Sequence, residues 1–208
     1  MADAEATGWF EPLYARADGD AGAVPWARQA PSPLLLQWLD QPGLDVTGAD
    51  VLVVGCGLGD DAAELTRRGC RVTAFDVAPS AVAWARQRFA DLDVSWEVAD
   101  LLDLPAHHAA AYGLVVEVRT VQSLPERVRG DALAAVAACV APGGVLVHAG
   151  LVATNPRAAL TWDGPPWALQ PDELRAYDRA GLRRLDLVHP TDVDADAMEV
   201  VLTMERPG

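Results

Sequence analysis

A short apolar run followed by three closely spaced glycines restricts the folds open to this chain more than any other feature. Residues 51–65 have the sequence VLVVGCGLGDDAAEL, in which an apolar strand leads through a glycine loop into a helix that starts with two aspartates. Glycine has no side chain, so a ligand can approach the backbone of such a loop closely. In open α/β sheets, ligands bind beyond the carboxyl ends of the strands. We therefore expect the loop after this strand to bind a ligand.

Apolar strands and helical segments alternate along most of the chain, which predicts an α/β fold with a mostly parallel sheet and helices on both faces. The last two expected strands are separated only by HPTDVDAD. That gap is too short for a helical crossover, so these strands should pair antiparallel. The seven expected strands are residues 50–55, 71–76, 94–100, 112–121, 145–151, 182–188 and 197–206, and the expected helices are residues 32–40, 60–69, 78–90, 126–140 and 171–181.

The length of 208 residues suits a single medium domain with a real core. We expect one domain over residues 1–208, in which residues 1–30 form a lid over the carboxyl ends of the strands and residues 31–208 form the core. The formal net charge is −14, and the sequence contains no run of basic residues. Nucleic acid is bound mainly through Lys and Arg, so it is not an expected partner. A neutral or cationic ligand suits the field of this chain better.

The first residues lack the basic and apolar segments of a secretory signal, and no apolar run approaches the ~18 residues of a membrane span. Three cysteines, Cys56, Cys70 and Cys139, are odd in number and widely spaced, which indicates neither a disulfide framework nor a metal site. These features predict a cytoplasmic, reduced protein, a monomer or homodimer, with no membrane or metal partner.

Two cofactor classes use a glycine loop at this position of an α/β fold. The dinucleotide fingerprint is G-x-G-x-x-G, with pyrophosphate on the helix N-terminus. Here Gly59 comes one place early, and Asp60 stands where the fingerprint has its third glycine. Carboxylates at the helix start oppose a pyrophosphate but satisfy the helix dipole. S-adenosylmethionine has no phosphate and carries two positive groups, so it suits this loop; a tight turn that simply needs glycines is the third interpretation.

Residues 51–150 resemble class I S-adenosylmethionine-dependent methyltransferases, because Asp76 ends the second strand, Asp100 follows the third, and APGGVLV leads into the fifth. The resemblance implies a Rossmann-like seven-stranded sheet with an antiparallel last strand. It also implies that Asp76 accepts hydrogen bonds from the ribose and that Asp100 faces the adenine. Val53 stands where the family often has an acid, and Asp60 or Asp61 could replace that acid. The implied cofactor residues are Trp26, Gly55, Cys56, Gly57, Gly59, Asp61, Asp76, Val77, Asp100, Leu101 and Glu117.

Several segments are similar to the thiopurine, thiol and halide methyltransferases within this class. They are VPWARQAPSP, LVVEVRTVQSLPERVR and DGPPWALQPDEL. The similarity implies that Trp26 packs on the cofactor and that residues 165–167 border the substrate. Val118 departs from the pattern, since the group often has an arginine there. The expected substrate-binding residues are Trp9, Tyr14 and Trp167.

The expected reaction is methyl transfer by direct displacement, in which the protein mainly aligns the reactants and excludes water. For a hydroxyl or amine acceptor, His148 or Glu117 is the candidate catalytic base; a hydrogen-bonded core histidine is the other interpretation of His148. Adjacent His107 and His108 are expected to be solvated rather than metal-bound. Three tryptophans are expected in the core: Trp38, Trp84 and Trp96.

The sequence favours S-adenosylmethionine-dependent methylation of a small molecule through a sulfur, oxygen, nitrogen or halide nucleophile. Two alternatives stay open. A nicotinamide-dependent oxidoreductase is disfavoured by Asp60 and by the absence of any lysine from the chain. A non-catalytic subunit that binds S-adenosylmethionine is the other.

Overall fold

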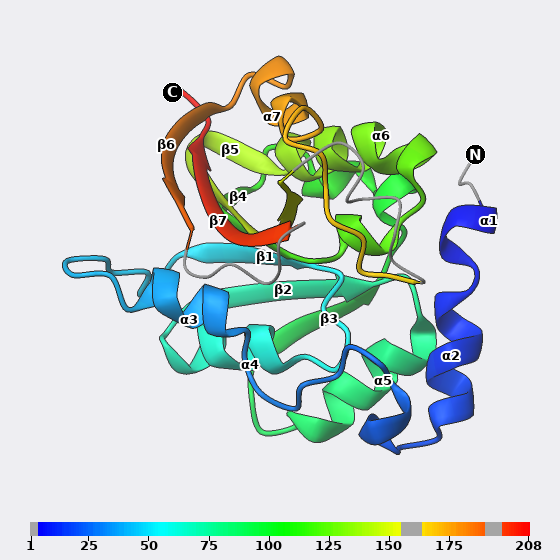
Figure 1. Cartoon of the computed structure of the whole chain (residues 1–208). Coiled ribbons are helices and arrows are strands. Elements are labelled where there is room, and N and C mark those ends of the chain that lie inside the picture. Colours follow the sequence, from blue (N-terminus) through cyan, green and yellow to red (C-terminus); the bar gives the residue numbers. More distant parts are fainter. Residues whose placement is uncertain (1–3, 155–163, 190–196) are drawn as a thin grey trace. The chain divides into compact units, whose positions relative to one another are not determined.

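The computed structural model describes residues 4–154, 164–189 and 197–208 (Figure 1). The chain divides into two compact units, Met1–Pro105 and Ala106–Gly208, which we call the N-terminal unit and the C-terminal unit. None of the described helices is long and apolar enough to cross a membrane.

The N-terminal unit is built on three parallel strands in the order β3-β2-β1. All of β1 after its first residue is buried, as its apolar sequence predicts. In chain order the elements are α1 (Ala4–Thr7), α2 (Phe10–Ala17), η1 (Ala21–Ala23), α3 (Pro33–Leu39), β1 (Asp50–Val54), α4 (Asp60–Arg67), β2 (Arg71–Asp76), α5 (Pro79–Arg88), β3 (Val94–Val98) and η2 (Leu101–Asp103).

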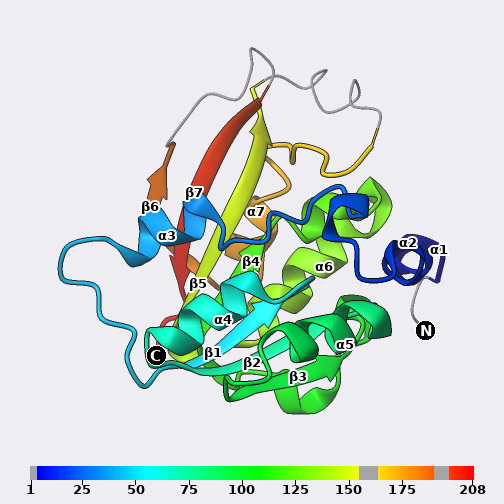
Figure 2. The ribbon, with the colours of Figure 1, turned by 90° about the horizontal axis from the view of Figure 1, so that it is seen from below.

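The C-terminal unit contains four strands in the order β4-β5-β7-β6. Strand β4 pairs parallel with β5, whereas β7 is antiparallel to both β5 and β6, between which it lies (Figure 2). In chain order the described elements of the C-terminal unit are η3 (Ala106–His108), β4 (Tyr112–Val118), η4 (Val121–Ser123), α6 (Glu126–Ala138), β5 (Val140–Ala153), α7 (Arg175–Arg179), β6 (Arg183–Val188) and β7 (Ala197–Glu205).

The fold class predicted from the sequence is confirmed: the seven strands are mostly parallel, the last is antiparallel, and helices alternate with them. Three elements differ from expectation by three residues or more. Strand β4 ends at Val118 rather than residue 121, because Val121–Ser123 form the short helix η4. Strand β5 starts at Val140 rather than residue 145, because Val140 pairs with Tyr112 across a register shift in β4. Helix α7 starts only at Arg175, because residues 171–174 form a turn in which the Glu173 side chain accepts from the Gln170 amide.

The described residues of the N-terminal segment, which was expected to form a lid, contain the helices α1 and α2. Helix α2 lies beside α5 in both views (Figures 1 and 2). Glu11 on α2 accepts hydrogen bonds from the backbone and the hydroxyl of Ser80, in the first turn of α5. A carboxylate at that helix end also complements the helix dipole. Within the N-terminal unit, the segment is therefore attached to α5 by polar as well as apolar contacts.

Candidate functional site

All three glycines of the loop after β1 have positive φ angles, 61° at Gly55, 51° at Gly57 and 88° at Gly59. Their neighbours differ. A Cβ on Gly59 would lie 2.7 Å from the indole of Trp96, so this glycine is required for packing. A Cβ on Gly57 would lie 3.1 Å from the hydroxyl of Tyr14. Gly57 therefore keeps the backbone bare beneath the N-terminal segment, which is the arrangement expected of a loop that a ligand approaches.

Asp76, at the end of β2, is joined to this loop by hydrogen bonds. Its carboxylate accepts from the amides of Gly57, at 2.8 Å, and Ala78, at 3.0 Å. The residue is only 7% exposed, and burial raises the pKa of its carboxyl above the usual value, although the backbone amides oppose that shift. A buried carboxylate gains from further hydroxyl donors, so its position and chemistry fit the two hydroxyls of a ribose.

Tyr14 and Trp26 lie together above the loop. The Trp26 indole donates to the Tyr14 hydroxyl at 2.8 Å, and the Trp26 ring also makes edge contacts with Trp9 and Phe10. Burial, together with the charge of Asp76, raises the pKa of the Tyr14 phenol. Tyr14 was expected to bind the acceptor substrate, but the structure places it beside the residues expected to bind the cofactor. Its assignment to the acceptor stays a prediction.

The N-terminal segment also contributes apolar packing around the loop. Tyr14, Ala17 and Val24 form one buried cluster with Leu58 of the loop and with Ala78 and Ala81 at the start of α5. The expected lid is thus partly hydrophobic core of the N-terminal unit. The core assignments of Trp38 and Trp96 are confirmed, since both are buried, while Trp84 is half-buried against the same cluster.

Asp100, the residue expected to face adenine, lies at the start of η2 with both carboxylate oxygens in use. One accepts from the Leu102 amide and the other from the Thr7 hydroxyl at 3.1 Å. Leu101 is buried beside it, and Val77 is half-buried after Asp76. A third segment of the N-terminal unit therefore meets the N-terminal helices at this edge of the sheet.

Two acids at the start of α4 have structural partners. Arg88 donates to both oxygens of Asp60, at 2.7 and 2.9 Å, and to the Leu58 carbonyl. Asp61 accepts from the Ser32 amide at 2.6 Å, at the N-cap of α3. Val53 stands where the family often has an acid. Neither Asp60 nor Asp61 is free to replace that acid unless it gives up these hydrogen bonds. Asp61 as a cofactor ligand stays a prediction.

We expect Asp61 to make stability depend on pH. Burial raises the pKa of its carboxyl from 3.8 to about 6. The folded state then holds this proton more tightly than the unfolded state, so the stability contributed by Asp61 is full below pH 4 and falls as the pH rises to about 6. Asp61→Asn should remove this dependence and become more stable relative to the parent by roughly 1–3 kcal/mol between pH 4 and 7.

Urea unfolding of the parent and Asp61→Asn between pH 4 and 7 measures this difference. Asp93→Asn, at an exposed position, is the control and should show no such trend. Parallel stability curves for the parent and Asp61→Asn would show that the Asp61 carboxyl titrates normally.

The candidate catalytic residues lie in the C-terminal unit, where Glu117 on β4 and His148 on β5 are register partners. Glu117 forms an ion pair with Nδ1 of His148 and accepts from the amides of Thr120 and Val121. Tyr177 places its hydroxyl 3.1 Å from the same Nδ1. Both candidate residues are fully buried. Among the described residues Nε2 of His148 has no hydrogen-bond partner, so it is the ring atom with a lone pair to offer when Nδ1 donates to Glu117.

Gln122 is a site residue that the sequence did not reveal. Its side-chain amide pairs with both backbone groups of Leu151 at 2.7 and 2.8 Å and donates to the Trp167 carbonyl at 3.0 Å. The backbone carbonyl of Gln122 accepts a hydrogen bond from the Trp167 backbone amide at 2.9 Å. Gln122 thereby fixes the segment that carries Trp167 beside the end of β5. Nothing local marks a glutamine for this role, because all its partners are distant in sequence.

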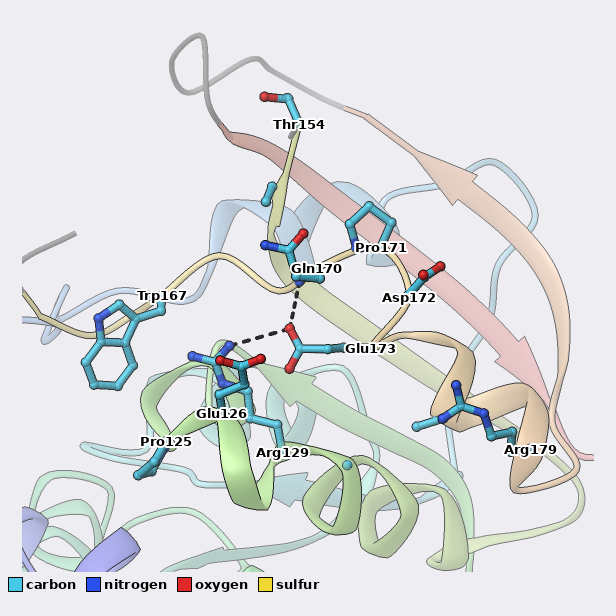
Figure 3. A pocket seen from close by; sticks show the side chains of 13 residues that line it. Pro125, Glu126, Arg129, Thr154, Trp167, Gln170, Pro171, Asp172, Glu173 and Arg179 are labelled. Carbon is cyan, nitrogen blue, oxygen red and sulfur yellow. Dashed lines mark hydrogen bonds and ion pairs between the residues drawn. The ribbon is translucent and has the colours of Figure 1, made fainter. Parts of the chain in front are cut away.

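Trp167 lines a pocket of about 1040 Å³ at the start of α6 and the end of β5 (Figure 3). Arg129 of α6 also lines this pocket and lies beneath the Trp167 ring, with its guanidinium carbon 5.8 Å from the ring centroid. Pro165 and Pro166, which were expected to border the substrate with Trp167, do not line it. The paired histidines differ from expectation too: His107 is exposed, but His108 is buried and its Nδ1 lies 2.9 Å from the Tyr112 hydroxyl.

Comparisons with known proteins agree with this geometry. The family described as "Methyltransferase domain" matches residues 51–144, the part that carries the glycine loop, Asp76 and Asp100. The ubiquinone biosynthesis O-methyltransferase of Xanthomonas axonopodis pv. citri is 30% identical over 176 residues, which cover 75% of this chain and 71% of the relative. The chain belongs to the class I S-adenosylmethionine-dependent methyltransferases.

Other relatives of this chain include the ubiquinone biosynthesis O-methyltransferase of Xanthomonas oryzae pv. oryzae, 29% identical over 78% of the chain. The chain spans 66% of that relative's length. The 2-heptyl-1-hydroxyquinolin-4(1H)-one methyltransferase of Mycobacteroides abscessus is 27% identical over 59% of the chain and 54% of its own length.

Solved structures show the same fold. One comes from work on conversion of a disulfide bond into a thioacetal group during echinomycin biosynthesis. It has a TM-score of 0.73 and 24% sequence identity, and the match covers 97% of this chain and 93% of that chain. Magnesium protoporphyrin IX methyltransferase from Synechocystis, solved with bound S-adenosylmethionine, has a TM-score of 0.64 and 17% identity over 83% of this chain and 76% of its own.

The family confirms S-adenosylmethionine as the cofactor predicted from the glycine loop and rules out the nicotinamide alternative. The narrower resemblance to thiopurine, thiol and halide methyltransferases stays a prediction. Ten of the eleven expected cofactor residues lie in the N-terminal unit, and only Glu117 lies in the C-terminal unit.

Proposed function

We propose that this protein transfers the methyl group of S-adenosylmethionine to a small-molecule acceptor, whose nucleophile attacks the methyl carbon in line with the departing sulfur. One observation carries the proposal: the bare backbone of Gly57 is bonded to the buried carboxylate of Asp76 directly beneath Tyr14 and Trp26. This arrangement offers a close backbone approach, an acceptor for ribose hydroxyls and an aromatic cover.

The residues of this arrangement have separate roles. When bound, S-adenosylmethionine supplies a methyl group made electrophilic by a positively charged sulfur. The Asp76 carboxylate holds the ribose, and the hydrogen-bonded pair Tyr14–Trp26 excludes water from the loop. Such exclusion strengthens electrostatic interactions within the site and holds the reactants in one alignment.

The acceptor nucleophile that we favour is a hydroxyl oxygen. One relative is named an O-methyltransferase and another is named for a hydroxyquinolinone. A hydroxyl acceptor must lose a proton, and Nε2 of His148 could hold it, since Glu117 and Tyr177 orient the ring through Nδ1. The sequence motifs shared with thiopurine and thiol methyltransferases make thiols the second acceptor class to test.

Incubating the protein with S-adenosylmethionine and a panel of catechols, hydroxyquinolones, thiols and iodide tests the proposal, with S-adenosylhomocysteine and methylated product measured by mass spectrometry. We expect turnover with aromatic hydroxyl compounds. Tight binding of S-adenosylhomocysteine without product from any acceptor would instead support a non-catalytic binding subunit.

Asp76→Ala is expected to lower the affinity for S-adenosylhomocysteine roughly ten- to a hundredfold, because hydrogen bonds to a charged acceptor contribute about 1.5–3 kcal/mol. Asp76→Asn keeps one acceptor oxygen, enough for only one of the Gly57 and Ala78 amides, and loses the charge; its affinity loss should be smaller than that of Asp76→Ala. Calorimetric titration measures both, with exposed Asp93→Ala as the control. An unchanged dissociation constant in Asp76→Ala would contradict the ribose assignment.

A further inference from the structure

The guanidinium of Arg129 is buried without a full set of acceptors. The residue is only 5% exposed. Its Nε donates to the Leu124 carbonyl at 2.9 Å, and its Nη1 lies 3.5 Å from Glu173, at the limit of a hydrogen bond. Among the described residues it has no other polar contact, although a guanidinium carries five N–H donors. A buried charge with unfilled donors is costly, and Arg129 lines the pocket, so its remaining donors suit an oxygen acceptor supplied by a ligand.

Trp167 gives the same pocket a flat, fixed wall. The backbone and side chain of Gln122 hold both backbone groups of Trp167. Figure 3 shows the indole close to Arg129, in agreement with the 5.8 Å between the guanidinium and the ring. An aromatic ring fixed beside a buried guanidinium matches a ligand that is itself planar and carries its anionic oxygens at one edge.

The acids near Arg129 set the balance of charge. Glu173 is the nearest, but its Oε2 also accepts from the Gln170 amide at 2.7 Å, so it is not dedicated to the arginine. Glu126 and Asp172 line the pocket as well, yet both are exposed, and water and salt screen exposed charges. The guanidinium is thus the buried charge that a ligand would meet.

We propose that this pocket binds a planar aromatic acceptor that carries a carboxylate, with the carboxylate on Arg129 and the ring against Trp167. The inference rests on the proposed function, since it takes the pocket to be the acceptor site. Arginine suits this role because its planar fork matches a carboxylate through two parallel hydrogen bonds.

The matched probes are 3,4-dihydroxybenzoate and catechol, which differ only in the carboxylate. Their affinities are measured by calorimetry on the full chain saturated with S-adenosylhomocysteine. We expect 3,4-dihydroxybenzoate to bind roughly ten- to a hundredfold more tightly than catechol. Arg129→Met should abolish that preference, whereas Arg127→Met, on an exposed position of the same helix, should keep it.

Glu173→Gln gives a result that a merely structural role would not produce. It removes the competing carboxylate but keeps an oxygen for the Gln170 amide, so binding of 3,4-dihydroxybenzoate should tighten by about three- to tenfold and binding of catechol should not change. This variant also tests the inference if Arg129→Met fails to fold. Equal affinities of the parent for the two probes, or a preference that survives Arg129→Met, would overturn the proposal.

The same titrations separate this inference from the proposed function. Turnover of catechol without any preference for the carboxylate would refute only the pocket assignment. A preference that depends on Arg129, but with no methylated product from any acceptor, would leave the binding site in place and refute methyl transfer.

Discussion

Gly57→Val is expected to lower the affinity for S-adenosylhomocysteine by roughly a hundredfold or more. Gly57 has a φ of 51°, and a Cβ there would lie 3.1 Å from the Tyr14 hydroxyl. A branched side chain cannot hold that backbone conformation without strain, and it would push against the aromatic cover of the loop. The hydrogen bond from the Gly57 amide to Asp76 would be disturbed as well.

Gly43→Val is the matched control for this substitution. Gly43 has a φ of 81°, and a Cβ there would meet nothing within 4 Å. This variant therefore carries similar backbone strain far from the loop, and it should lose some stability while keeping cofactor affinity. Calorimetric titration and thermal unfolding compare the two. Parent-like binding by Gly57→Val would mean that the cofactor site has been misplaced.

Removal of residues 1–30 is expected to reduce methyl transfer by roughly a hundredfold or more, because misalignment and water entry each slow such a displacement. The segment provides the Tyr14–Trp26 pair above the glycine loop and the Thr7 hydroxyl bonded to Asp100. The alternating strands and helices begin after this segment, so the sequence alone predicts that the shortened chain still folds. Because Tyr14 packs in the core of the N-terminal unit, we now expect the shortened chain to fold with a lower melting temperature.

Tyr14→Phe separates the two contributions of that segment. It keeps the ring in the apolar cluster but removes the hydroxyl that accepts from Trp26, so stability should change little and cofactor affinity should fall by about fivefold. Thermal unfolding, cofactor affinity and turnover are compared for the parent, Tyr14→Phe and the shortened chain. Full activity in the shortened chain would refute the lid, and complete loss of folding would show that the segment is entirely core.

Features set by short-range sequence pattern were predictable. The order of strands and helices followed from apolar periodicity, and β2 was predicted to the residue. The glycines at positions 55, 57 and 59 permit the positive φ angles that the structure shows there. The position of Asp76 at the end of β2 followed from the same pattern, because the side chain at a strand's carboxyl end faces the ligand edge of the sheet. Apolar periodicity depends on neighbours within a few residues, so the sequence by itself determined the fold class, and its glycine loop favoured S-adenosylmethionine as the cofactor.

Only the tertiary structure decided which polar side chains are free and which are already bonded. Asp60 and Asp61 are adjacent in sequence, yet Arg88 holds one and the Ser32 amide holds the other, 28 and 29 residues away. Likewise, Arg129 and Trp167 lie against each other at the pocket, and no local pattern connects the two. A hydrogen bond or ring contact depends on where distant segments pack. Local sequence does not distinguish among the many possible partners of a side chain, so the packing of the whole fold selects one. The sequence therefore favoured the cofactor, while the packing of distant segments decided which polar side chains are already bonded within the fold.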